Sequence, residues 1–139
     1  RPSNPKKYKG DSKNIVYRSL WERKFMNYCD LNENILEWAS EEFWIPYKDP
    51  TTNRVRRYFP DFFIKYKDKD SNIRRSVIEV KPMRETKEPK ATKGKSRKTL
   101  INESMTYAKN QAKWKAAREF CDDRKLEFKI MTEKELGIR

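Results

Sequence analysis

Two short motifs place charged side chains at the ends of apolar segments. Asp61 follows Pro60 at the start of an apolar run, and Glu79 and Lys81 flank Val80 at the end of another. Side chains alternate between the faces of a strand, so Glu79 and Lys81 are expected on one face. A buried, unpaired carboxylate is costly unless a cation or hydrogen bonds compensate it. The motifs therefore favour a site in which Asp61 and Glu79 bind a divalent cation.

Mg²⁺ fits two such carboxylates. It prefers oxygen ligands, keeps several waters, and accepts one or two protein carboxylates together with a substrate phosphate. Mn²⁺ is expected to substitute for it. Lys81 could then orient or help deprotonate an attacking water. The alternative is an ordinary surface Asp61 beside an ordinary Glu79 and Lys81 strand pair, because a pattern this short occurs often by chance.

The charge of the chain favours a polyanionic partner. Its 139 residues carry a net charge of +13, of which residues 1–14 contribute +4 and residues 81–98 contribute +6. Such runs are either solvated tails or phosphate-binding segments, and their position around a carboxylate pair favours DNA or RNA. Because no apolar run approaches the roughly 20 residues of a membrane span, no membrane partner is expected.

The residue types that are absent narrow the chemistry. The chain has no histidine, which excludes His-based nucleases and Ser-His or Cys-His catalysis. Its two cysteines, Cys29 and Cys121, cannot form a four-cysteine zinc site, and we expect buried free thiols in a reducing compartment. The first residues are basic and lack the apolar region of a signal peptide, so we expect a cytoplasmic site of action.

Hydrophobic periodicity predicts a single α/β domain of order α-β-β-β-α-β. Ser19 and Glu22 form a capping-box pattern at the start of the first helix, and turn residues separate the strands. Three consecutive antiparallel strands are expected between the two long helices. The predicted elements are a helix ending near 31, strands 43–47, 56–66 and 73–81, a helix 100–125 and a strand 126–131.

This order resembles the PD-(D/E)XK nuclease superfamily, with Asp61 on the second strand and Glu79-Val80-Lys81 on the third. The chain also resembles the branch of this superfamily that contains the TnsA transposon endonuclease, because it has a glutamate, Glu22, on the first helix. The chain also resembles the head completion nucleases of T-even-type tailed phages from about residue 8 to 132. That resemblance is carried by Tyr17-Arg18-Ser19, Trp21-Glu22, Ile45-Pro46-Tyr47, Arg56-Arg57-Tyr58-Phe59, Ile78-Glu79-Val80-Lys81-Pro82, Asn102-Glu103 and Lys113-Trp114-Lys115-Ala116-Ala117.

The resemblance implies a restriction-endonuclease-like core, with a mixed central sheet flanked by helices. It implies that Asp61 and Glu79 hold Mg²⁺, that the Val80 carbonyl is a further ligand, and that Lys81 positions the water or stabilises charge on the phosphate. Glu22 keeps two interpretations. It either caps the helix through Ser19 or faces the metal site as a third catalytic carboxylate.

The nuclease domain is expected to span residues 1–139, with a basic N-terminal tail (1–14) and a basic loop (83–99). The loop directly follows the third strand, so side chains on it would lie near the scissile phosphate. On the second long helix, one lysine is also expected to reach phosphate. The predicted DNA-binding residues are Arg84, Lys87, Lys90, Lys93, Lys95, Arg97, Lys98 and Lys113.

The function implied by the resemblance is Mg²⁺-dependent hydrolysis of DNA phosphodiester bonds with little sequence specificity, by an endonuclease or exonuclease. Such a protein would trim or cut packaged DNA during phage head completion and head–tail joining. It would act in the host cytoplasm or stay in the virion, with portal or neck proteins as partners. Two alternatives stay open: a TnsA-like transposon end-cutting endonuclease, and a DNA-binding structural adaptor at the portal vertex.

Overall fold

The computed structural model describes residues 2–15 and 19–137, so Tyr17 and Arg18 of the first resemblance block lie outside the described residues. The elements in chain order are η1 (Pro5–Lys7), α1 (Leu20–Leu31), β1 (Ile35–Ser40), β2 (Ile45–Asp49), β3 (Arg54–Tyr58), β4 (Phe62–Lys67), β5 (Ile73–Val80), η2 (Met83–Thr86), α2 (Arg97–Asp123), β6 (Glu127–Met131) and α3 (Glu133–Leu136).

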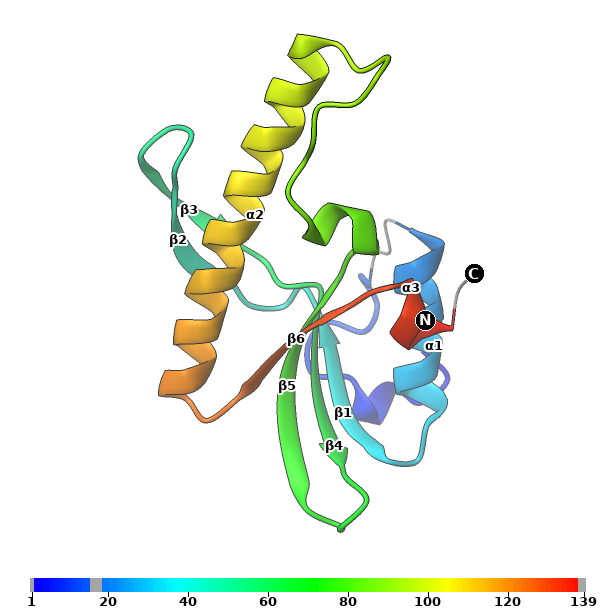
Figure 1. The fold of residues 1–139 in the computed structure, drawn as a ribbon. Coiled ribbons are helices and arrows are strands. Elements are labelled where there is room, and N and C mark those ends of the chain that lie inside the picture. The colour runs from blue at the N-terminus through cyan, green and yellow to red at the C-terminus, as the bar shows by residue number, and fades with distance from the viewer. Residues whose placement is uncertain (1, 16–18, 138–139) are drawn as a thin grey trace.

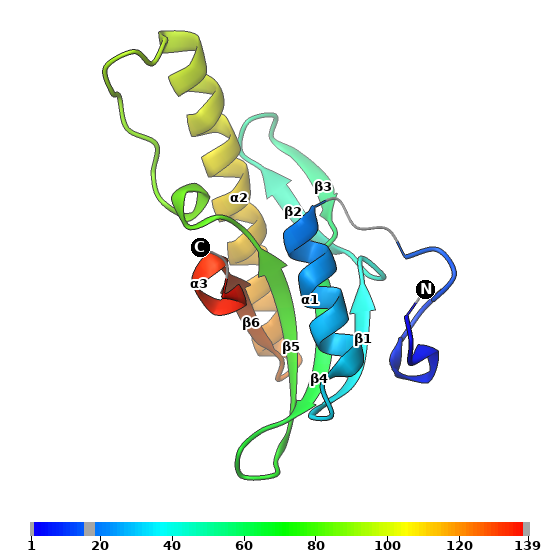
Figure 2. The same cartoon turned by 90° about the vertical axis from the view of Figure 1, so that its right-hand side faces the viewer.

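A four-stranded mixed sheet of order β1-β4-β5-β6 forms the centre of the molecule. β4 is antiparallel to both β1 and β5, whereas β6 is parallel to β5. Parallel neighbours need a crossover connection, which α2 provides. α1 covers one face of the sheet and α2 lies on the opposite side (Figure 1, Figure 2). The predicted mixed sheet flanked by helices is confirmed.

Each long helix packs on its own hydrophobic cluster. Phe25 of α1 and Trp38 of β1 belong to the cluster that includes Ile78 and Val80 of β5. On the other side, Trp114 of α2 packs in a second cluster with residues of the β2–β3 hairpin. Because side chains alternate along β5, Glu79 points away from α1 and toward α2. The prediction that Glu79 lies on the opposite face of the strand from Ile78 and Val80 is therefore confirmed.

The predicted core order α-β-β-β-α-β is correct, but its first strand was misplaced. The first core strand is β1, which the sequence pattern did not reveal, whereas the predicted strand 43–47 overlaps β2 in a separate two-stranded sheet. The pairing of β1 with β4 shifts register between Ile35 and Glu37. After the shift, Trp38, Ala39 and Ser40 are buried in succession, so the buried and exposed side chains do not alternate and the period-2 signal of a strand is lost.

The predicted strand 56–66 is two strands, so the expectation of three consecutive antiparallel strands is wrong. β3 ends at Tyr58 and pairs with β2, whereas β4 begins at Phe62 and joins the central sheet. Pro60 lies between them, fully buried, and its ring nitrogen cannot donate to a strand ladder. Turn residues separate the predicted strands 43–47 and 56–66, and β2 and β3 form an antiparallel hairpin around this turn.

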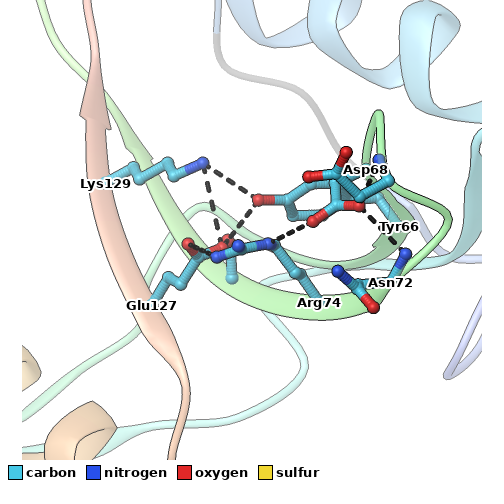
Figure 3. A network of polar contacts seen from close by, with 8 residues as sticks. Tyr66, Asp68, Asn72, Arg74, Glu127 and Lys129 are labelled. Atoms are coloured by element: carbon cyan, nitrogen blue, oxygen red, sulfur yellow. Dashed lines mark hydrogen bonds and ion pairs between the residues drawn. The ribbon is translucent and has the colours of Figure 1, made fainter.

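A polar network joins β4, β5 and β6 at the end of the sheet away from the Glu79 motif (Figure 3). Glu127 of β6 accepts hydrogen bonds of 2.7 Å from the hydroxyls of Tyr66 and Ser76. Arg74 contacts Glu127 through Nη1 at 3.3 Å and Asp68 through Nε at 2.6 Å. These contacts stabilise the parallel register of β6 beside β5, which carries the candidate site.

The basic segments at either end of the motif-bearing core are structured. Lys7 donates through Nζ to the carbonyls of Cys29, Asp30 and Asn32 at the end of α1, at 2.8 to 3.1 Å. The ring of Tyr8 is buried against Trp38. The predicted loop 83–99 is shorter, because η2 occupies its beginning and α2 starts at Arg97.

The two cysteines, Cys29 and Cys121, are both free and buried, as predicted. Burial raises the pKa of the Cys121 thiol to about 11, so this group is a neutral packing residue near pH 7. None of the helices in residues 2–15 and 19–137 has both the length and the hydropathy that crossing a membrane requires.

Candidate active site

The two sequence motifs meet where β5 ends, next to the beginning of α1 and the base of the β2–β3 hairpin (Figure 2). Asp61 lies at the break between β3 and β4, and its Oδ2 accepts a 2.8 Å hydrogen bond from the backbone amide of Val80. The β4–β5 register pairs Phe62 with Ile78, which brings Asp61 beside the end of β5. Strand pairing thus brings Asp61 and Glu79 together, although they are far apart in the sequence.

Glu79 is the most enclosed charged group of the site, with 4% of its surface exposed. Its Oε2 accepts a 3.3 Å hydrogen bond from the indole Nε1 of Trp114 on α2. Burial, followed by the charge of the neighbouring Glu79 carboxylate, raises the pKa of Asp61 to about 8. Two adjacent buried carboxylates favour sharing one proton when no cation is present.

An open cleft of about 490 Å³ contains both carboxylates and two lysines, Lys81 and Lys113. Lys81 follows the last residue of β5, and Lys113 extends from α2. Burial lowers the pKa of the Lys113 ammonium group, and the positive charge of Lys81 acts in the same direction. The cleft therefore places two cations beside two carboxylates, an arrangement that can hold an anionic phosphate. Its other lining residues are Glu41, Arg57, Tyr58 and Phe59.

Glu22 lies on the opposite side of Asp61, in an adjoining cleft of about 570 Å³ that also includes Val80 and Lys81. The predicted helix cap at Ser19 is confirmed, since its hydroxyl oxygen accepts a 3.1 Å hydrogen bond from the Glu22 amide. The same hydroxyl lies 3.3 Å from Oε2 of Glu22. The side chain of Glu22 thus has a capping contact and also borders the space next to Asp61 and Lys81.

The donor set at Asp61 and Glu79 fits a hydrated divalent cation. The pair carries two like charges that a cation would neutralise, as the raised pKa of Asp61 indicates. The hydroxyl of Tyr58 is buried beside this pair, and burial followed by the charges of Glu79 and Asp61 raises its pKa. In residues 2–15 and 19–137, no three acidic or cysteine side chains group closely enough to hold a metal by themselves. Two carboxylates with backbone and water oxygens suit Mg²⁺.

The predicted DNA-binding residues fall into three sets. Arg84, Lys87 and Lys90 line a groove of about 860 Å³ between the loop and α2. Lys95 also lines the groove, but its ammonium pairs with Glu103 at 3.0 Å and holds the loop against α2. The remaining predicted residues are Lys93, Arg97 and Lys98, which are exposed near the start of α2, and Lys113, which lies in the cleft with Asp61.

A mixed sheet flanked by helices, with a carboxylate pair and a lysine at the end of adjacent strands, defines a restriction-endonuclease-like nuclease fold. The family model described as "TnsA-like endonuclease N terminal" matches residues 32–133, and the chain belongs to this family. The chain is also similar to the "Head completion nuclease" of Enterobacteria phage T4. The two are 39% identical over 135 residues, which cover 95% of this chain and 87% of that protein.

Sequence reasoning missed four residues that line the cleft: Glu41, Arg57, Tyr58 and Phe59. The sequence predicts one continuous strand through Arg57, Tyr58 and Phe59, whereas β3 ends at Tyr58 and all three residues line the cleft. Trp114 of α2 is also absent from the predicted site, and its buried indole donates through Nε1 to Glu79. A buried Trp needs a hydrogen-bond acceptor for its indole N–H. This requirement was the one feature of the sequence that could have indicated a contact between Trp114 and a polar side chain such as Glu79.

Proposed function

We propose that this chain is a Mg²⁺-dependent DNA nuclease with little sequence specificity, acting in phage head completion. The observation that carries the proposal is the cleft in which Asp61, Glu79, Lys81 and Lys113 meet at the end of β5. Family membership and the nearly full-length similarity to a head completion nuclease support the same class of activity. Portal or neck proteins are the expected partners, and DNA is the expected substrate.

Each side chain of the cleft has a separate task in this proposal. Asp61 and Glu79, with the Val80 carbonyl, would hold Mg²⁺, which supplies Lewis-acid activation of water and phosphate when bound. Lys81 orients the attacking water and stabilises negative charge that develops on the phosphate. Lys113 donates to a phosphate oxygen, where its positive charge stabilises the additional negative charge of the transition state. Glu22 assists from the adjoining cleft as a third carboxylate.

Digestion of a supercoiled plasmid tests the proposal directly. We expect the purified protein to nick or linearise the plasmid with Mg²⁺ or Mn²⁺ and to leave it intact with EDTA. A closed circle has no ends, so cleavage would establish endonuclease activity, and later shortening of a linear product would add exonuclease activity. Intact plasmid under all metal conditions would contradict the proposal.

Glu22→Gln distinguishes the capping role of Glu22 from a catalytic one. Glutamine is isosteric and leaves the backbone amide that donates to Ser19, so we expect the unfolding free energy to change by less than about 1 kcal/mol. Loss of the carboxylate should lower plasmid cleavage at least about 10-fold. Ser19→Ala is the stability reference, since it removes the cap itself and should destabilise α1 by about 1 kcal/mol. Full activity of Glu22→Gln would remove Glu22 from the catalytic set.

Charge removal in the basic loop tests its contact with the DNA backbone. Replacing Lys87, Lys90 and Lys93 by Gln should weaken binding to all DNA sequences alike. Each lost phosphate contact should lower the slope of log K against log salt by about 0.9. Filter binding or anisotropy over a salt series measures this slope. Lys125→Gln, which removes one positive charge at an exposed position after α2, is the control for loss of a lysine outside the loop. An unchanged slope would show that the loop does not contact the backbone.

A TnsA-like transposon endonuclease is the second candidate, and the family match to residues 32–133 favours it. Such an enzyme would depend on a partner transposase, whereas the proposed nuclease cuts alone. The third candidate is a structural adaptor at the portal vertex. Normal virion yield with Asp61→Ala in a phage assembly assay would favour the adaptor, because cutting would then be dispensable.

A further inference from the structure

The β2–β3 hairpin has two chemically different faces. Strand alternation directs Ile45, Tyr47 and Tyr58 toward α2, where they are buried in the cluster that contains Trp114. The opposite face carries Trp44 and Phe59, which flank the pair Ile45–Tyr58 and are 45% and 43% exposed. Two large aromatic side chains are thus presented on the outer side of the hairpin.

The outer face also carries positive charge. The guanidinium carbon of Arg57 lies 4.8 Å from the ring centroid of Trp44, a cation–π contact. The β2–β3 register places Lys48 on the same face as Arg57, whereas Arg54 and Arg56 lie on the inner face with Asp49. Exposed aromatic rings combined with a positively charged surface are the features by which proteins hold unpaired nucleotides, since bases stack on rings and phosphates contact cations.

This face is continuous with the candidate active site. Arg57 and Phe59 line the same cleft as Asp61 and Glu79. Phe59 is two residues from Asp61, so their Cα atoms are at most about 7 Å apart. A nucleotide advances a DNA strand by about 3.4 Å in a duplex, so a base on Phe59 would lie within a few nucleotides of the scissile phosphate.

We propose that the outer face of the β2–β3 hairpin, built on Trp44, Arg57 and Phe59, binds unpaired nucleotides, and that the preferred substrate is DNA with a frayed or forked end. The inference rests on the proposed nuclease function. In an intact duplex the base faces stack on one another, so these rings have no base to accept. Where strands separate, stacking holds the unpaired bases and directs the adjacent phosphate into the cleft.

Binding of two labelled DNAs of equal length and charge tests this proposal: a blunt duplex, and a duplex whose end is forked by short thymidine arms. Anisotropy is measured in EDTA, so that no cleavage occurs. We expect the wild-type protein to bind the forked DNA at least about 10-fold more tightly, because stacking of one base contributes a factor of roughly 5 to 150. Equal affinity for the two DNAs would overturn the inference.

The variant Trp44→Ala/Phe59→Ala should abolish most of that preference and change binding to the blunt duplex less than about 3-fold. Both side chains are half exposed, so the fold should persist, and thermal unfolding checks this. Tyr28→Ala is the matched control, because Tyr28 is an exposed aromatic residue on α1, 53% exposed. Trp44→Phe should retain most of the preference. A double variant that keeps the preference would overturn the inference.

Other outcomes separate this inference from the nuclease proposal. Plasmid cleavage with Mg²⁺ but no preference for forked DNA would overturn the hairpin assignment and leave the nuclease proposal supported. Preference for forked DNA without plasmid cleavage would support the hairpin assignment and contradict the nuclease proposal. If the double variant keeps both DNA affinities and loses only virion assembly, the face binds a protein partner, and the nucleotide-binding assignment is wrong.

Discussion

Glu79→Gln is expected to lower DNA cleavage at least about 1,000-fold while leaving the protein folded. The substitution removes a buried negative charge but keeps an oxygen that accepts the hydrogen bond from Nε1 of Trp114. A metal site that loses one of two carboxylates loses both affinity and the charge balance needed to activate water. Plasmid digestion at several Mg²⁺ concentrations, with circular dichroism to check the fold, measures the effect.

A matched control makes the Glu79→Gln result specific. Glu119→Gln changes the same residue type at an exposed position of α2 and should cut plasmid at the wild-type rate. Partial recovery of Glu79→Gln activity at high Mn²⁺ would indicate that the lost function is metal binding. Cleavage by Glu79→Gln within about 3-fold of wild type would show that the chemistry lies elsewhere in the chain.

Asp61→Asn is expected to inactivate the protein and, unusually for a buried polar substitution, to stabilise it at alkaline pH. An unfolded Asp carboxyl titrates near pH 4, whereas in the folded protein the pKa of Asp61 is raised to about 8. Between these values the folded state binds a proton that the unfolded state lacks, so wild-type stability falls as pH rises. The contribution is fully present below about pH 4 and lost above about pH 8.

Asparagine carries no charge and still accepts the hydrogen bond from the Val80 amide. In EDTA at pH 8 we expect Asp61→Asn to raise the unfolding free energy by about 2 kcal/mol, less than the full linkage value because Asp61 is partly exposed. The difference should shrink toward zero as the pH is lowered to 5. Urea denaturation across this pH range measures it. Asp123→Asn, an exposed position, is the control and should show no such dependence.

Mg²⁺ provides an independent readout of the same pair. A ligand that binds the folded state stabilises it by about 2.7 kcal/mol at 100 times its dissociation constant. We therefore expect Mg²⁺ to raise the melting temperature of the wild-type protein and not that of Asp61→Asn. The EDTA and Mg²⁺ curves of wild type should differ most near pH 8, where the carboxylate pair is most nearly ionised. An equal Mg²⁺ effect on both proteins would place the ion at another site.

Local patterns predicted much of the element order, and they failed where the chain departs from a regular period. The cap at Ser19 and the turn after Asp49 follow from residue preferences over a few positions, and both are confirmed. β1 was missed because its register shift removes the alternation on which the prediction depends. The predicted strand 56–66 is too long, because Pro60 cannot donate to a strand ladder and separates β3 from β4.

The sequence alone determined the chemistry available to this protein. The absence of histidine, the carboxylates Asp61 and Glu79, and the lysine two residues after Glu79 restrict the mechanism, because residue type and strand alternation are local properties. Tertiary structure decided which groups meet. The register of β4 on β5 brings Asp61 to Glu79, and packing of α2 adds Trp114 and Lys113. Those contacts join residues distant in sequence, and burial of whole helix and sheet faces selects them.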